Sequence, residues 1–303
     1  MKRVLTAVVL IPLVLALVLR GPLWLVALVA ALFAVLATRE YLDLISAQNL
    51  PALRLPAWIV VAALLATMVL ATVGEELSEA AIGIGLVTLL LGPYIFLATA
   101  IRQADFRGAI GVAAASALAI PYVVIPLGIV VVLRSLTTGW YYLILLFTVV
   151  WSGDIFAYYI GRAIGRHKLA ARVSPKKSWE GAIASLVGSA LLAVVITQFG
   201  PSLQERLVGV GLVDAPQSGD YGGPILRPPV WVALLFAVVV NASAQVGDLV
   251  ESMIKRGAGV KDSGTLMPGH GGILDRIDAL LFAAPAAAVY LIPMQHYFVT
   301  PGS

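Results

Sequence analysis

The sequence contains no cysteine, only three histidines and few charged residues. Without cysteine the chain cannot form disulfides, bind a metal through thiolates or use a thiolate nucleophile. Lysine, arginine, aspartate and glutamate make up 12% of the 303 residues, where soluble domains carry about 25%. Hydrophobic residues account for 60% of the chain, and the mean hydropathy is +0.98. This composition is too apolar for a water-soluble surface and indicates a protein that crosses the membrane several times.

Several catalytic motifs are also missing from the sequence. No Walker A pattern occurs, which argues against a P-loop NTPase. Neither H-E-x-x-H nor G-x-S-x-G occurs, so nothing indicates a zinc protease or a serine hydrolase. The isoelectric point is near 9.4, but a positive excess in a membrane protein usually lies in its cytoplasmic loops. We therefore expect the lipid bilayer, and no nucleic acid, as a partner.

Long apolar stretches recur along the whole chain. A membrane-spanning helix needs about 20 such residues, and we predict an all-α polytopic membrane protein with about nine transmembrane helices. A signal peptide is not expected at the N-terminus, because the first apolar run continues into the second without a small-residue cleavage site. Two prolines, Pro121 and Pro126, predict a kink in the fifth span. The predicted spans are 4–19, 22–38, 57–73, 80–100, 109–133, 141–161, 182–199, 230–247 and 274–293.

The distribution of basic residues predicts the orientation of these spans. With the N-terminus in the cytoplasm, 16 of the 20 lysines and arginines fall on the cytoplasmic side, as the positive-inside rule requires. The two richest polar loops, 162–181 and 248–278, then face the cytoplasm. We accordingly divide the chain into an N-terminal group of about five spans, 1–140, and a catalytic membrane region, 141–303.

Three aspartates flank the last cytoplasmic loop. Asp248 ends the eighth predicted span, whereas Asp275 and Asp278 begin the ninth, three residues apart and so on one face of a helix. Carboxylates near a membrane boundary are often merely interfacial, but these continue into apolar sequence, where an unpartnered charge is costly. An oxygen-only set of ligands suits Mg²⁺ better than zinc. We therefore predict a Mg²⁺ site at Asp248, Asp275 and Asp278.

Two further residues stand in unusual surroundings. Asp154 lies inside the sixth predicted span, and an ionisable residue within the membrane indicates a functional site by default. His270 stands between Gly269, Gly271 and Gly272, where backbone N–H groups could contact a phosphate or a leaving group. Alternatively, the glycines simply form a turn and the histidine is structural.

The stretch YYIGRAIGRHKLAARVSPKKSWEG concentrates positive charge in the other polar loop. Lys168, Lys176 and Lys177 are point charges of the kind that bind phosphate. The alternative is topological, since basic residues also hold a loop in the cytoplasm. Gly161 and Gly165 form a G-x-x-x-G pattern that helix packing alone could explain. Together the two loops and the carboxylates indicate Mg²⁺-assisted phosphate chemistry on a lipid.

The segment SMIKRGAGVKDSGTLMPGHGGILDRID, residues 252–278, resembles the signature of phosphatidate cytidylyltransferases. That signature has a serine, Lys-Arg, Lys-Asp, Pro-x-His-Gly-Gly and a closing Asp-Arg-x-Asp at fixed spacing. The segment departs from it at Met267, where the family usually has another apolar residue of similar volume. The stretch around 154–181 is similar to a second region of the family, with Ser178 in place of a common threonine. The resemblance covers 150–293 well and the N-terminal half only as generic membrane helices.

The resemblance implies an enzyme that joins CTP and phosphatidic acid to give CDP-diacylglycerol and pyrophosphate, with Mg²⁺ as cofactor. It also implies a homodimer in a bacterial inner membrane, with an active site open to the cytoplasm. The residues implied in catalysis are Asp248, Lys255, Lys261, Asp262, His270, Asp275 and Asp278. Those implied in substrate binding are Asp154, Lys168, Ser174, Lys176, Lys177 and Arg256.

Two other kinds of protein fit the same residues. A CTP-dependent lipid kinase uses related chemistry and would release CDP in place of pyrophosphate. An ion or lipid transporter could line its path with Asp154 and Asp248, although the sequence shows no inverted repeat of the kind many transporters have. A CDP-alcohol phosphotransferase is disfavoured, because its D-G-x-x-A-R motif is absent.

Overall fold

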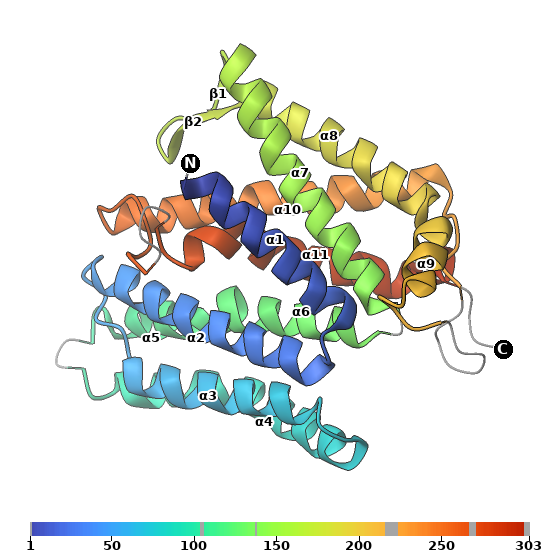
Figure 1. Cartoon of the computed structure of the whole chain (residues 1–303). Coiled ribbons are helices and arrows are strands. Elements are labelled where there is room, and N and C mark those ends of the chain that lie inside the picture. Colours follow the sequence, from blue (N-terminus) through green and yellow to red (C-terminus); the bar gives the residue numbers. More distant parts are fainter. Residues whose placement is uncertain (1, 104–105, 137, 216–223, 267–270, 300–303) are drawn as a thin grey trace. The chain divides into compact units, whose positions relative to one another are not determined.

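The computed structural model describes residues 2–103, 106–136, 138–215, 224–266 and 271–299, and it is mostly helical (Figure 1). Every predicted span coincides with helix. The elements in chain order are α1 (Lys2–Arg20), α2 (Leu23–Ser46), α3 (Arg54–Leu70), α4 (Glu75–Ala100), α5 (Ala109–Ala117), a π-helix η1 (Ile120–Val124), α6 (Ile125–Ser135), α7 (Gly139–Ile164), β1 (Lys168–Ala170), β2 (Ser174–Ser178), α8 (Trp179–Gln198), α9 (Gly200–Gly209), α10 (Val230–Gly257) and α11 (Leu274–Phe298).

Within the described residues, seven helices are long and apolar enough to cross a membrane. Two of the predicted spans correspond to shorter apolar helices, Ile11–Arg20 and Arg54–Leu70. The predicted number of nine transmembrane helices is therefore not confirmed, although the class, a helical membrane protein, is. The seven are Leu23–Ser46, Leu77–Ala100, Ala109–Ser135, Gly139–Ile164, Trp179–Gln198, Val230–Gly257 and Leu274–Phe298.

The predicted irregularity in the fifth span is confirmed. The π-helix η1 separates α5 from α6, with Pro121 in its first turn and Pro126 just beyond it. Proline lacks the backbone N–H that would continue an α-helical ladder, and a π-turn is one of the ways in which a helix absorbs such a gap. Tyr122, in η1, packs against Tyr41 of α2 with 5.5 Å between the ring centroids.

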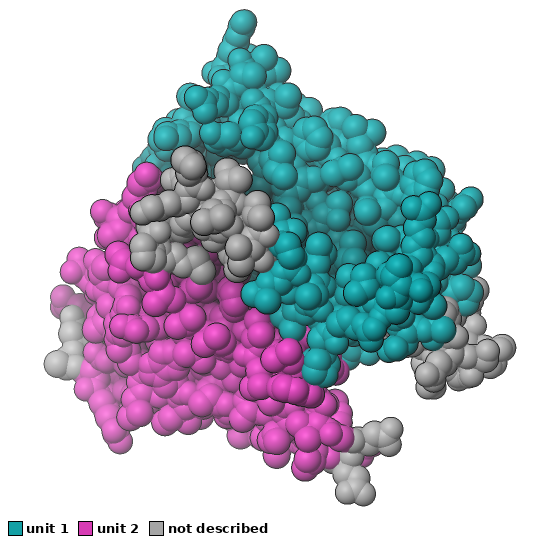
Figure 2. All heavy atoms as spheres, viewed as in Figure 1, with its two compact units in different colours: residues 1–22, 132–249, 279–303 teal, residues 23–131, 250–278 magenta. Residues whose placement is uncertain are grey.

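The helices form two compact units, each built from separate parts of the chain (Figure 2). Unit 1 comprises residues 1–22, 132–249 and 279–303, and unit 2 comprises residues 23–131 and 250–278. The chain passes from one unit to the other between α1 and α2 and again within α6, α10 and α11. This division follows packing, whereas the predicted one at residue 140 concerned function and stays a prediction.

In unit 1, α7 and α8 pack against each other, and α9 follows α8 directly in the chain (Figure 1). A Cβ atom on Gly181 would lie 3.2 Å from the Cα of Gly161, and one on Gly165 would lie 2.4 Å from the Oγ of Ser178. Lipid is as apolar as the side chains, so close backbone approach and van der Waals contact hold such helices together. The G-x-x-x-G pattern thus serves helix packing here.

A buried polar cluster joins α7, α8 and α10 within unit 1. Asn241 donates to the Oγ of Ser185 at 2.9 Å, and Gln245 donates to the Oδ1 of Asn241 at 2.6 Å. A Cβ atom on Gly153 of α7 would stand only 2.3 Å from the Nδ2 of Asn241. In an apolar medium polar groups must find partners within the protein, and Gly153 leaves the space for this cluster.

The loop predicted at 162–181 contains a two-stranded antiparallel hairpin, β1–β2, that leads directly into α8. Ser178 is the N-cap of α8, and its Oγ accepts a hydrogen bond from the N–H of Gly181 at 3.2 Å. Glu180 in the first turn accepts from the backbone N–H of His167 at 3.2 Å and contacts its Nδ1 at 2.6 Å. The cap and this pair fix the hairpin to the helix start.

In unit 2, α2, α3, α4 and α5 pack together with η1. The Tyr41 hydroxyl of α2 donates to the carbonyl of Ala115 at 2.8 Å, and the N–H of Leu53 donates to the Oγ of Ser116 at 2.9 Å. The last residues of α10, the loop that follows and the first turn of α11 belong to the same unit. The segment that resembles the family signature is therefore packed with N-terminal helices, apart from residues 267–270, which lie outside the described residues.

Candidate active site

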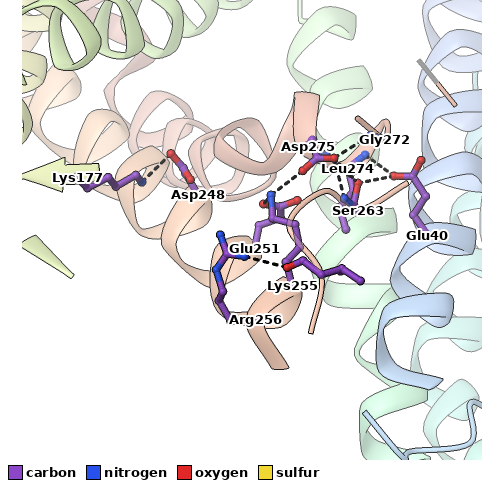
Figure 3. A network of polar contacts seen from close by, with 11 residues as sticks. Glu40, Lys177, Asp248, Glu251, Lys255, Arg256, Ser263, Gly272, Leu274 and Asp275 are labelled. Atoms are coloured by element: carbon purple, nitrogen blue, oxygen red, sulfur yellow. Dashed lines mark hydrogen bonds and ion pairs between the residues drawn. The ribbon is translucent and has the colours of Figure 1, made fainter. Parts of the chain in front are cut away.

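Asp275 is the centre of a hydrogen-bond network in unit 2 (Figure 3). Its Oδ1 accepts from the Nζ of Lys255 at 2.6 Å. Its Oδ2 accepts from Ser263 N at 2.8 Å, Ser263 Oγ at 2.9 Å and Gly272 N at 2.8 Å. The side chain is only 8% exposed. Both oxygens of the buried carboxylate therefore have hydrogen-bond partners, three donor groups around Oδ2 and one at Oδ1.

Lys255, near the end of α10, is held between two carboxylates. It pairs with Asp275 and, one helical turn earlier, with Glu251, whose side chain is completely buried. The lysine side chain is itself 10% exposed. Its predicted place around substrate phosphates stays a prediction. Glu251 was missed by sequence reasoning, although a glutamate four residues before a lysine on an apolar helix is a recognisable pairing signal.

A second residue that the sequence did not reveal is Glu40 of α2. It is 8% exposed and accepts three hydrogen bonds from the loop and the start of α11. The donors are Ser263 Oγ at 2.8 Å, Ile273 N at 2.9 Å and Leu274 N at 2.8 Å (Figure 3). The second predicted span ends at residue 38, whereas α2 continues to Ser46, so Glu40 lies outside the predicted span but inside the helix.

The glycines of the signature segment are required by close approach. Gly271 has φ of +79°, which L-residues rarely adopt, and a Cβ atom there would stand 2.6 Å from the Oδ2 of Asp275. One on Gly272 would stand 2.2 Å from the Oγ of Ser263. Close contacts with neighbouring side chains therefore require glycine at both positions. His270 and Gly269 lie outside the described residues, and the predicted contact of His270 with a phosphate stays a prediction.

The remaining residues of the segment lie at its surface or edge. Arg256 donates through Nη1 to the carbonyl of Val260 at 3.0 Å. Lys261 and Asp262 are exposed on the loop, and Asp278 is partly buried one turn after Asp275. Both aspartates of α11 are helical, as their spacing predicted.

In unit 1, three of the predicted residues come together. Lys177, in β2, pairs with Asp248 of α10 at 2.6 Å, and both are partly exposed, at 24% and 35%. Asp154 of α7 lies close enough to interact electrostatically with both. The other predicted residues of this group, Lys168, Ser174 and Lys176, are on the hairpin, with both lysines exposed. The hairpin therefore places positive charge beside two acidic residues, Asp154 and Asp248.

The three carboxylates predicted to bind Mg²⁺ were tested against this geometry. Asp248 belongs to unit 1, whereas Asp275 and Asp278 belong to unit 2. Among the residues that the structure describes, no three histidine, cysteine, aspartate or glutamate side chains are grouped closely enough to hold a metal ion. The donor chemistry nevertheless suits Mg²⁺, which commonly uses one or two carboxylates and completes its shell with water and substrate phosphates. The residues fit an ion that arrives with a nucleotide better than a preformed metal cage.

The fold and these contacts define an integral membrane protein that carries acidic and basic polar networks on two units of a helical framework. Comparison with known proteins then places it more narrowly. The model of the cytidylyltransferase family matches residues 1–293, and the chain belongs to this family.

Curated bacterial relatives carry the name phosphatidate cytidylyltransferase. The one from Staphylococcus haemolyticus is 32% identical over 292 residues, which cover 96% of this chain and 99% of that protein. The one from Brucella abortus is 47% identical over 153 residues, 50% of this chain and 47% of the relative. The one from Haemophilus influenzae is 42% identical over 147 residues, 48% and 44% of the two chains. The higher-identity matches thus span about half the length of those relatives.

Proposed function

We propose that this protein transfers the cytidylyl group of CTP to phosphatidic acid, giving CDP-diacylglycerol and pyrophosphate for phospholipid synthesis. The observation that carries the proposal is the network around Asp275, which is built from the segment that resembles the cytidylyltransferase signature (Figure 3). The names of the bacterial relatives support the choice of substrates.

In the proposed reaction, a phosphate oxygen of phosphatidic acid attacks the α-phosphorus of CTP in line. The new P–O bond forms as the bond from the α-phosphorus to the bridging oxygen breaks, and pyrophosphate leaves with that electron pair. The nucleophile is already anionic, so no strong general base is needed. We expect no covalent enzyme intermediate.

The chain's own residues bind and orient the two phosphate-bearing substrates in this proposal. Exposed basic side chains neutralise charge that builds up during transfer. Asp154 and Ser174 lie on the nucleotide side, and His270 contacts a phosphate or the leaving group. The basic residues proposed for this role are Lys168, Lys176, Lys177, Arg256 and Lys261, with Lys255 and Asp262 beside them.

Mg²⁺ is the proposed cofactor, with Asp248, Asp275 and Asp278 as the carboxylates that would hold it. When bound, it would neutralise phosphate oxygens and stabilise the leaving pyrophosphate. Because three donor groups surround Oδ2 of Asp275 and only the Nζ of Lys255 contacts Oδ1, we infer that an ion at Asp275 would bind through Oδ1, beside the positive charge of Lys255.

The proposed setting is a bacterial inner membrane, with the N-terminus and the active site on the cytoplasmic side. The bias of basic residues toward one set of the predicted loops supports this orientation. CTP is water-soluble and phosphatidic acid is a membrane lipid, so an active site at the cytoplasmic surface would meet both. A homodimer is proposed from family resemblance.

One incubation tests this function. Purified protein is supplied with Mg²⁺, CTP and phosphatidic acid in lipid–detergent micelles, and pyrophosphate and CDP-diacylglycerol are quantified. We expect the two products in equal amounts, and none when phosphatidic acid is replaced by diacylglycerol. Release of CDP with a phosphorylated lipid would favour a CTP-dependent lipid kinase. Nucleotide left intact, with lipid or ion flux in vesicles, would favour a transporter.

A further inference from the structure

Glu40 is a buried acidic residue that lies far in sequence from every predicted site residue. It belongs to α2, in the N-terminal half of the chain, where only generic membrane helices were expected. Its carboxylate nevertheless accepts hydrogen bonds from Ser263, Ile273 and Leu274, more than 220 residues away. An uncompensated buried carboxylate would be very costly, so these donors account for its presence.

The contacts of Glu40 are those of a helix cap supplied by another helix. Ile273 and Leu274 stand at the start of α11, where backbone N–H groups have no partner within the helix. The negative charge also meets the positive end of the helix dipole. Ordinarily a serine, threonine, aspartate or asparagine at the helix start supplies such a cap. Here the position before α11 is Ile273, which cannot cap, and Glu40 does so instead.

Glu40 is joined to the network of Asp275 through one hydroxyl. The Oγ of Ser263 contacts the Oε2 of Glu40 at 2.8 Å and the Oδ2 of Asp275 at 2.9 Å. Moving Glu40 would therefore free the Ser263 hydroxyl, which also contacts Asp275. Asp275 in turn accepts a hydrogen bond from the ammonium of Lys255. The three carboxylates Glu40, Asp275 and Glu251 form one chain of contacts with Ser263 and Lys255.

Two glycines of the signature segment leave the space that Glu40 occupies. A Cβ atom on Gly264 would stand 2.6 Å from the Oε1 of Glu40, and one on Gly272 would stand 2.3 Å from its Oε2. The loop can thus close around this carboxylate only because both positions lack a side chain. The glycine content of the segment, which first suggested a phosphate-binding turn, is explained at these positions by an internal carboxylate.

A residue just beyond α2 contacts the same region. Gln48, in the turn after α2, donates to the carbonyl of Ile254 at 3.1 Å, and a Cβ atom on Gly257 would stand 2.4 Å from its Oε1. The C-terminal part of α2 and the turn that follows it therefore support both the end of α10 and the start of α11.

We propose that Glu40 is a positioning residue of the cytidylyl-transfer site, which holds the loop of Ser263 and the first turn of α11 so that Asp275 and Lys255 keep their orientation. This inference rests on the proposed function and adds the N-terminal half to the catalytic machinery. Glu40 itself touches no reacting atom in this account. A displacement of about 1 Å in groups that align a reaction can cost on the order of 10²-fold in rate.

The test compares Glu40→Gln with the wild type and with Thr38→Val. Glutamine keeps the size of the side chain but turns an NH₂ group toward an N–H donor. Thr38 is two residues away on the same helix, is fully buried, and its Oγ1 has no hydrogen-bond partner in the structure, so its nearly isosteric replacement controls for substitution within α2. We expect Glu40→Gln to lower kcat by about 10²-fold with a much smaller change in the KM for CTP, and Thr38→Val to retain wild-type turnover.

Hydrogen exchange supplies a readout that does not depend on activity. In Glu40→Gln the amides of Ile273 and Leu274 should exchange at least about tenfold faster, because a hydrogen bond to a charged group is worth roughly 1.5–3 kcal/mol. Amides in α3 and α4 should keep their wild-type protection. Wild-type exchange at Ile273 and Leu274, or wild-type kcat in a folded Glu40→Gln protein, would overturn the proposal.

Two further arms keep the result interpretable. If Glu40→Gln does not fold, Glu40→Asp is measured instead. Aspartate retains the charge but is one methylene shorter. Wild-type turnover and wild-type amide protection in this variant would overturn the proposal. Intermediate turnover in Glu40→Asp supports it. If the wild type makes no CDP-diacylglycerol, the proposed function fails, whereas the exchange experiment still decides whether Glu40 holds the start of α11.

Discussion

At the scale of single residues, the site is organised by carboxylates that are already satisfied within the protein. Four donor groups lie within hydrogen-bond distance of Asp275 and three lie within that distance of Glu40, and the single hydroxyl proton of Ser263 is shared between the two carboxylates. In a medium of low polarity such hydrogen-bonded groups hold a loop rigidly. Removing one partner leaves a buried polar group unpaired, which is energetically costly. Asp275 therefore acts first as an internal acceptor for the backbone of its own segment and for Lys255.

Asp275→Asn tests this role. The amide would turn an NH₂ group toward either the ammonium of Lys255 or the N–H groups of Ser263 and Gly272, so one buried donor would lose its acceptor. We expect turnover to fall by at least about 10²-fold in the pyrophosphate-release assay. The control is Asp43→Asn, since Asp43 forms an exposed ion pair with Arg54, of a kind that contributes little. Near-wild-type turnover in Asp275→Asn would remove this residue from the site.

At the scale of elements, small residues allow the helices to meet closely, and polar residues join them. Gly153 of α7 faces Asn241 of α10 and Ser185 of α8, whose side chains are hydrogen-bonded to each other. Within the bilayer such contacts substitute for the hydrophobic effect that drives packing in water. The framework of unit 1 thus depends on the absence of a side chain at this position.

Gly153→Ala should lower the free energy of unfolding by about 1–3 kcal/mol, the usual cost of overpacking a close contact. The added methyl group would stand 2.3 Å from the Nδ2 of Asn241 and 2.8 Å from the Oγ of Ser185. Thermal unfolding in detergent measures the effect as a lower Tm. The control is Gly209→Ala at the end of α9, where an added Cβ atom would meet no other described residue within 4 Å outside its own helical turn. Equal Tm values for the two variants would contradict this account of the helix contact.

The sequence predicted the helices well and the internal contacts of the site poorly. Hydrophobicity places a helix in the membrane whatever its neighbours are, and spacing alone put Asp275 and Asp278 on one helical face. The hydrogen-bond partners of a carboxylate depend on which distant helix packs beside it, and a local sequence pattern does not predict that packing. Glu40 was missed for this reason, and because two polar residues, Arg39 and Glu40, suggested that the second span had ended, although α2 continues to Ser46.

At the scale of the whole molecule, two units share the segments on which the proposed chemistry depends. Unit 2 holds the network of Glu40, Lys255 and Asp275, and unit 1 holds the pair of Lys177 and Asp248 (Figure 2). Both networks include α10, which contributes Asp248 to the pair in unit 1 and Lys255 to the network in unit 2. The catalytic machinery proposed here is therefore distributed over N-terminal and C-terminal parts of the chain.

The predicted orientation can be tested because the chain has no cysteine. A single introduced cysteine is then the only thiol, and Arg172 in the hairpin turn and Arg206 on α9 are both exposed positions. In intact spheroplasts, a membrane-impermeant maleimide should label Arg206→Cys, whereas Arg172→Cys should react only after permeabilisation. The reverse pattern would show that the hairpin and its lysines face away from the cytoplasm.

The most direct measurement of the central claim follows the individual phosphates of CTP. The purified protein is incubated with phosphatidic acid, Mg²⁺ and CTP labelled with ³²P at either the α- or the γ-phosphate, and the lipid is extracted. Cytidylyl transfer predicts that the α-label enters the lipid as CDP-diacylglycerol and that the γ-label leaves as pyrophosphate. Recovery of the γ-label in the lipid, with CDP released, would contradict the account and identify a kinase instead.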